Sequence, residues 1–137
     1  MTDVLLSIRP KYVDAILIGS KQYEFRKQIF REIQQPRIFI YSTSPVKKIV
    51  ACFFPGEIIE DHPDNLWKQF GEVSGLDEAD FFNYYEGKQC GYAIRIDELE
   101  QFHQPLDPKA VIDHFVPPQS FCYVKFANNS PIGTQIP

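Results

Sequence analysis

The amino-acid sequence predicts an α+β fold in which about five or six short strands form a small mixed β-barrel with short helices at its periphery. Three observations lead to this prediction. The candidate strands are short and alternate between apolar and polar residues, unlike the apolar strands of a doubly wound sheet. Short helical patterns fall in the connections between them. The 137 residues, of which 44% are hydrophobic and 15% aromatic, suffice for one core.

The first third of the chain alternates strand and helix. Val4–Arg9 is a strand rich in branched residues, and Pro10 then suits the first position of a helix, because its missing N–H would have no partner there. Apolar residues on one face carry this helix to Gly19, which ends it as a C-terminal cap. In Gln22–Lys27 aromatic and charged residues alternate, and a period of two indicates a half-buried strand.

Four more strands and three short helices are expected in the remainder. The predicted strands are Arg37–Tyr41, Val46–Glu60 with a bend at Pro55-Gly56, Gln89–Ile96 and Ser120–Phe126. The predicted helices are Asn65–Phe70, Glu78–Tyr85 with Asp77 as its N-cap, and Pro108–His114. We expect residues 1–126 to form a single domain. The turn-forming composition of residues 127–137 predicts a loosely structured C-terminal tail.

Composition limits the class of protein. No apolar run approaches the ~20 residues that span a bilayer, and the N-terminus lacks the pattern of a signal peptide. We therefore expect a cytoplasmic protein with no membrane partner. The three cysteines are widely spaced and the three histidines share no ligand spacing, so we expect no metal site and no cofactor.

Charge is distributed unevenly along the chain. The formal net charge of −4 argues against coating of nucleic acid by bulk charge. Residues 1–48 nevertheless contain nine Lys or Arg against four acidic residues, a net of +5, whereas residues 49–137 contain five against fourteen, a net of −9. This asymmetry is explained either by a local basic surface on an acidic body or by scattered solvated charges.

The densest cluster of functional groups surrounds the second predicted strand. Lys21 follows the glycine that ends the helix, and Glu24 and Arg26 lie two residues apart on one face of the strand. Lys21 and Arg26 suit a phosphate, and Glu24 could orient Arg26, accept a hydrogen bond from a base or ribose hydroxyl, or act as a general base. The alternative is an ordinary ion pair on a solvated face. We expect Lys21, Glu24 and Arg26 to lie close together at the mouth of a concave site, with Arg9 or Lys11 near enough to add positive potential.

The segments around this cluster resemble the ASCH-domain family. The resemblance rests on the strand and proline of Leu6–Pro10, on a helix that ends in Gly-x-Lys at Gly19–Lys21, and on Glu-x-Arg at Glu24–Arg26. It covers most of residues 4–126. The further segments that share it are Ile40–Pro45, Ile49-Val50, Tyr84–Gly87 and Pro117–Phe121.

The resemblance implies a PUA-like β-barrel whose cleft is lined by the Gly-x-Lys-x-x-Glu-x-Arg segment, and it implies binding of RNA or a modified nucleotide. Some family members are enzymes: one bacterial branch resembles an amidohydrolase of an acetylated cytidine, and others are described as ribonucleases. That branch has a Thr where this chain has Glu24, so the hydroxyl nucleophile is missing here. Hydrolysis of a modified nucleoside or RNA, with Glu24 as base and Lys21 stabilising charge, is the alternative function. A protein-interaction module with protein partners is a third.

Other residues are candidates for the ligand-binding side of such a cleft. Tyr41 and Ser42 end a strand and could face it, although turn chemistry at a strand end is the commoner explanation. Gln119 could read a base because two prolines before it stiffen the backbone; a rigid strand entry explains it equally. Aromatic residues of the helix at 78–85 could stack on bases but at helical spacing are more often core residues. The full predicted ligand-binding set is Arg9, Lys11, Lys21, Glu24, Arg26, Tyr41, Ser42, Gln119 and Ser120, with Glu24 and Lys21 catalytic if the protein is an enzyme.

Overall fold

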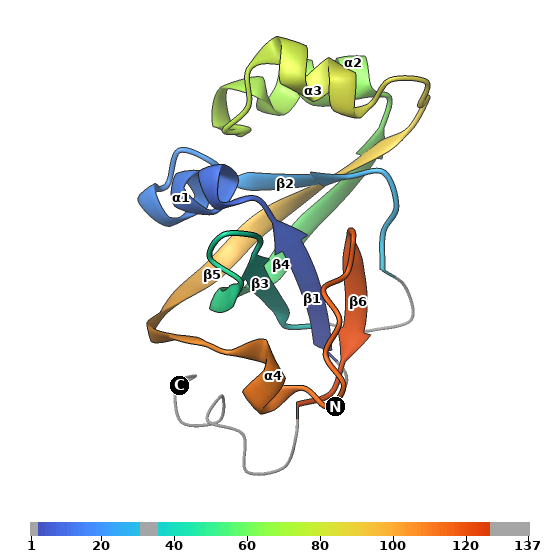
Figure 1. The fold of residues 1–137 in the computed structure, drawn as a ribbon. Helices are drawn as coiled ribbons and strands as arrows, with labels where there is room; N and C mark the ends of the chain where they lie inside the picture. Colours follow the sequence, from blue (N-terminus) through green and yellow to red (C-terminus); the bar gives the residue numbers. More distant parts are fainter. Residues whose placement is uncertain (1–2, 31–35, 127–137) are drawn as a thin grey trace.

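The computed structural model describes residues 3–30 and 36–126, and these residues share one six-stranded sheet in the order β2-β5-β4-β3-β1-β6 (Figure 1). The predicted tail at 127–137 lies outside the described residues. The strands are β1 (Asp3–Ile8), β2 (Tyr23–Arg26), β3 (Ile38–Ser42), β4 (Lys48–Asp61), β5 (Gly91–Leu106) and β6 (Phe121–Val124). The helices are α1 (Pro10–Ile18), α2 (Pro63–Phe70), α3 (Glu78–Tyr84) and α4 (Pro108–Val111), with a 3-10 turn η1 (Gly71–Val73).

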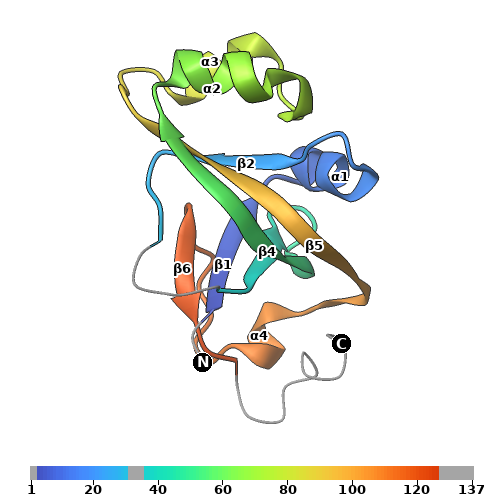
Figure 2. The same cartoon turned by 180° about the vertical axis from the view of Figure 1, so that it is seen from behind.

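The sheet is mixed and curls into a half-barrel, which confirms the predicted fold class (Figures 1 and 2). Strand β1 runs parallel to β3 on one side and antiparallel to β6 on the other. The first and last described strands are therefore neighbours in one sheet. The remaining pairs, β3 with β4, β4 with β5 and β5 with β2, are antiparallel.

Strands β1 and β3 are buried on both faces, which differs from the half-buried strands that the sequence predicts. Along β3, Ile38 and Ile40 pack in one apolar cluster with α1, whereas Phe39 and Tyr41 pack in a second cluster on the other side of the sheet. The helix α1 begins at Pro10 and ends at Gly19 in the left-handed region with φ of 90°, both as predicted.

The two long strands β4 and β5 cross the molecule diagonally and carry the helical cap α2-η1-α3 at one end (Figure 2). The prediction that a strand ends at Ile96 is wrong, because β5 continues to Leu106. Only Phe102 and Leu106 are buried in this added half, so its sequence is largely polar and lacks a regular period of two. Pro55 is tolerated within β4 because the pairing of β4 with β3 ends at Phe53.

A third apolar cluster fixes the helical cap on β2 and the start of β5. In it Phe25 meets Phe81 edge to face, with ring centroids 5.2 Å apart. Asp77 caps α3 as predicted, because its carboxylate accepts a hydrogen bond from the amide of Asp80 at 2.8 Å. Within the described ranges no helix has the length and apolar character needed to cross a membrane.

Candidate functional site

A pocket of about 820 Å³ opens where the end of β1, the first turn of α1, the β2 segment and α3 come together. Six of the nine predicted ligand-binding residues line it: Arg9, Lys11, Lys21, Glu24, Arg26 and Gln119. We call this cavity the basic pocket. Four cationic side chains face it against two carboxylates, those of Glu24 and Asp80, a net of +2 when every group is charged.

The other three predicted residues lie outside the lining. Ser120 does not line the pocket but contacts Arg26, because its hydroxyl accepts a hydrogen bond from Arg26 Nη1 at 3.1 Å. Ser42 is buried at the end of β3, and its neighbour Thr43 lines the pocket instead. The structure does not bring Tyr41 to the pocket, because strand alternation turns it to the opposite face of the sheet, where its ring lies 5.3 Å from that of Phe115. Burial raises the pKa of Tyr41.

Lys21, Glu24 and Arg26 form a buried ionic triad. The Glu24 Oε2 atom lies 2.7 Å from Arg26 Nη2, and Glu24 Oε1 lies 3.5 Å from Lys21 Nζ. The side chains of Glu24 and Arg26 are each 9% exposed and that of Lys21 is 2% exposed. An ion pair on a solvated face is therefore the wrong interpretation of this pattern.

Long-range hydrogen bonds hold the triad in place. Arg26 Nη2 donates to the carbonyl of Ser7 at 3.2 Å, so its guanidinium spans from β2 to β1 and β6, across the open side of the half-barrel. Lys21 Nζ donates to the carbonyl of Ser74 at 2.7 Å, which ties β2 to the turn between α2 and α3. Tyr85 donates from its hydroxyl to the carbonyl of Arg26 at 3.1 Å. These contacts fix the positions of the charges before any ligand arrives.

The electrostatics of the triad favour an anionic ligand. Burial lowers the pKa of Lys21, and the neighbouring carboxylate of Glu24 opposes that shift. The triad carries two cations and one carboxylate, so one positive charge is left without an anionic partner inside it. Arg26 Nε is buried and has no hydrogen-bond partner within residues 3–30 and 36–126. An anion in the pocket would balance the excess positive charge of the triad.

One wall of the basic pocket consists of residues that the sequence interpretation did not select. Asp80, Asn83 and Tyr84 line it from α3. They are spaced i, i+3 and i+4, hence on one side of the helix, whereas Phe81 of the same helix and Tyr85, its C-cap, pack into the core. The helical spacing carried this signal, but the aromatic residues of α3 were interpreted together as core. Tyr84 is half-buried in the pocket wall, and Lys27 Nζ lies 4.5 Å from its ring centroid.

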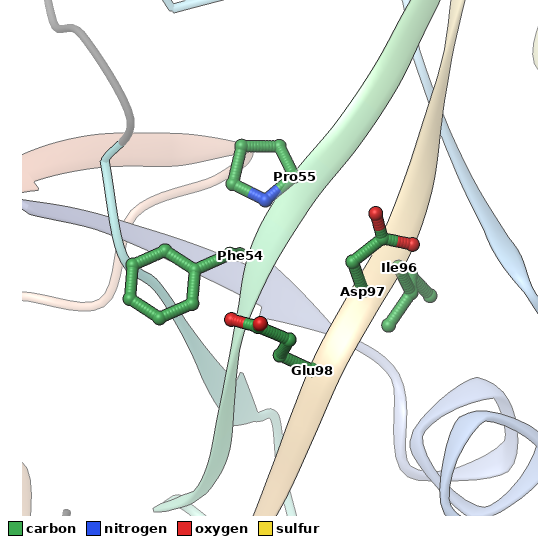
Figure 3. A pocket seen from close by; sticks show the side chains of 5 residues that line it. All are labelled: Phe54, Pro55, Ile96, Asp97 and Glu98. Carbon is green, nitrogen blue, oxygen red and sulfur yellow. The ribbon is translucent and has the colours of Figure 1, made fainter.

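A second cavity, of about 630 Å³, lies on β4 and β5 and has a different character. Figure 3 shows Phe54 and Pro55 on β4 beside Asp97 and Glu98 on β5. Its charged groups are acidic, and Asp97 is already paired with Arg95 at 2.9 Å. This surface does not suit an anion. In the part of the chain that the structure describes, no three His, Cys, Asp or Glu residues are grouped as metal ligands.

The fold and the basic pocket define a PUA-like α+β half-barrel protein with a pocket lined by four basic residues. Known proteins narrow this class. The ASCH domain-containing ribonuclease of Zymomonas mobilis is 31% identical over an alignment of 137 positions, which covers 91% of this chain and 90% of that protein. The chain belongs to the ASCH domain family. No family model matches it.

Solved structures of a Zymomonas mobilis ASCH protein share the fold of this chain. One crystal structure of that protein matches with a TM-score of 0.82 and 28% identity, and the match covers 90% of this chain and 87% of that one. A Tyr→Phe variant and a Ser→Ala variant of the same protein each match with a TM-score of 0.82 and 27% identity.

Proposed function

We propose that this protein binds RNA in the basic pocket. The observation that carries the proposal is the buried triad, in which Lys21 and Arg26 outnumber Glu24 and are fixed by hydrogen bonds to other parts of the fold. A buried excess cation is unfavourable unless an anion compensates it. Phosphate is the anion that a fixed guanidinium and ammonium recognise best, because it offers several acceptor oxygens at once.

The surroundings of the triad support a polymeric ligand with repeated phosphates. Arg9, the N-cap of α1, and Lys11, in its first turn, line the same pocket at the helix N-terminus, where the helix dipole adds positive potential. Gln119 faces them from the segment that enters β6, and its amide can pair with a base edge. The relative from Zymomonas mobilis is named a ribonuclease, and that name makes RNA the first ligand to test.

The binding test compares two exposed lysines. Lys11 lines the pocket, whereas Lys109 lies on α4, and both are exposed. Fluorescence titrations of single-stranded RNA and tRNA are measured across a series of salt concentrations. Lys11→Ala should weaken binding to every sequence and reduce the slope of log K against log salt by about one. Lys109→Ala should change neither. The absence of binding to both RNAs at low salt would refute the proposal and favour a protein-interaction module.

RNA cleavage is the second candidate function, and the name of the relative favours it. In this proposal Glu24 takes the proton from the attacking water or ribose hydroxyl, whose oxygen bonds to phosphorus while the bond from phosphorus to the leaving ribose oxygen breaks. The leaving oxygen takes up a proton from solvent, and Lys21 stabilises the negative charge that develops on the phosphate.

Glu24→Gln separates binding from chemistry, because it keeps the shape of the side chain and removes the carboxylate. Turnover of a labelled RNA should disappear, while the affinity of the folded variant for RNA changes modestly. Unfolding curves of both proteins establish that the variant is folded at the assay temperature. Full turnover by a folded Glu24→Gln variant would eliminate Glu24 as the base. No turnover by the wild type would leave RNA binding alone as the function.

A further inference from the structure

The α3 wall of the basic pocket combines a carboxylate, an amide and an aromatic ring. Asp80, Asn83 and Tyr84 face the pocket from successive turns of one side of α3. The cations Lys21, two residues before β2, and Arg26, on β2, also line it. The pocket therefore has one positively charged wall and one wall whose side chains are neutral or negatively charged.

The carboxylate of Asp80 stands in the first turn of α3, where a negative charge suits the helix dipole, and it also lines a pocket in which basic side chains predominate. Its charge repels an anion, and it has no ion-pair partner among residues 3–30 and 36–126 that would neutralise it. Asn83 is exposed, and its amide likewise donates no hydrogen bond to another residue within those ranges. A ligand that presents N–H donors to Asp80 and an acceptor to Asn83 would satisfy both groups.

We propose that this wall is a guanine-selective subsite, an inference that rests on the proposed binding of RNA. Guanine presents two adjacent N–H donors, at N1 and N2, which match the two oxygens of a carboxylate such as that of Asp80. Its O6 lies next to them and accepts from the amide of Asn83. Adenine, cytosine and uracil each place a ring nitrogen or carbonyl acceptor where a second donor is needed, so the carboxylate repels them.

The aromatic residues of the pocket suit the faces of the same base. The rings of Tyr12, from α1, and Tyr84, from α3, both line the cavity. Bases of single-stranded RNA are held by stacking on such rings while their Watson–Crick edges are read by polar side chains. The phosphate next to the guanine then lies toward Lys21 and Arg26. In this proposal the carboxylate of Asp80 distinguishes guanine from the other nucleobases.

The test uses four RNA pentamers that differ only in the central base within a uridine context, with 2′-O-methyl riboses to prevent cleavage. A bidentate pairing discriminates between bases by about 5- to 150-fold in affinity. We expect the guanine pentamer to bind the wild type tighter than the other three by a factor in that range. Asp80→Asn should reduce the preference to less than about twofold and strengthen binding of the non-guanine pentamers, because it removes a repulsive charge.

Glu78→Gln is the matched control, since it removes one negative charge from an exposed position of the same helix, outside the pocket lining. It should leave the guanine preference intact. Equal binding of all four pentamers, or a preference that survives Asp80→Asn, would overturn the guanine subsite while leaving RNA binding in place. If no pentamer binds the wild type, the proposed function fails and the subsite fails with it.

Discussion

Removal of the Glu24 charge tests how the ionic triad contributes to stability. Glu24→Gln leaves Lys21 and Arg26 as buried cations without a carboxylate, at side-chain exposures of 2% and 9%. Breaking a buried pair by neutralising one partner costs about 3–5 kcal/mol of the free energy of unfolding. For 137 residues, that loss corresponds to a fall in melting temperature of about 10–17 °C. The lost free energy is a large share of the ~5–15 kcal/mol that stabilises a domain.

A double-mutant cycle shows whether the loss comes from the unpaired cations. Lys21→Met replaces a desolvated ammonium by an apolar chain of similar length, so alone it should change stability much less than Glu24→Gln does. The double variant should recover part of the loss, with a coupling energy of about 1–3 kcal/mol. Urea denaturation followed by circular dichroism measures all four proteins, with equal m-values as the check that unfolding stays two-state.

The exposed pair of Arg95 and Asp97 supplies the control. Its side chains are 46% and 36% exposed, and its atoms lie as close as 2.9 Å. Solvent screens such a pair, so Asp97→Asn should shift the melting temperature far less than Glu24→Gln. The reasoning is refuted if the two variants have the same stability, or if the coupling between Lys21 and Glu24 is zero.

Three further outcomes are expected. Gly75→Ala should weaken RNA binding in titrations, because Gly75 has φ of 70° and an added Cβ would lie 2.7 Å from the Cβ of Lys21. Gly87→Ala is the control: Gly87 has φ of 78° but open space around it, so this variant should retain the wild-type affinity. Tyr85→Phe should cost about 1–2 kcal/mol in urea denaturation, because the carbonyl of Arg26 loses a buried donor. Burial lowers the pKa of Lys21 in the folded protein below 10.5. Between the lowered pKa and 10.5, the unfolded chain holds a proton that the folded chain has released, so the stability of the wild type relative to Lys21→Met should rise with pH in that window. Thermal melts at a series of pH values measure this difference.

Local signals in the sequence predicted the elements that carry the triad. Pro10 and Gly19 mark the ends of α1 through their backbone conformations, which do not depend on distant contacts. The period of two in Tyr23–Arg26 placed Glu24 and Arg26 on one face of β2. The sequence did not predict their burial, because burial depends on where β2 lies relative to β1, β6 and the helical cap.

The rest of the site depends on contacts that no local pattern encodes. Arg26 reaches Ser120 across 94 positions of the chain, and Lys21 reaches Ser74 across 53. The α3 wall was missed for a related reason. Tyr84 and Tyr85 are adjacent aromatic residues, yet one lines the pocket and the other packs in the core. Only the position of the helix relative to β2 decides which of the two rings lines the pocket and which packs in the core. Tyr41 shows the same limit, since strand alternation alone does not reveal which face of β3 meets the cleft.

The guanidinium of Arg26 has two tasks at once, and this limits how binding data can be interpreted. Its Nη atoms meet Glu24, the carbonyl of Ser7 and Ser120, so they join β2 to the opposite edge of the sheet. The same group lines the pocket and supplies positive charge there. A lysine cannot replace it, because one ammonium lacks the planar, divergent donors of a guanidinium. Loss of RNA affinity in an Arg26 variant therefore mixes a lost charge with a loosened half-barrel. Lys11 contributes charge to the same pocket from an exposed position on α1, so its variant isolates the electrostatic contribution.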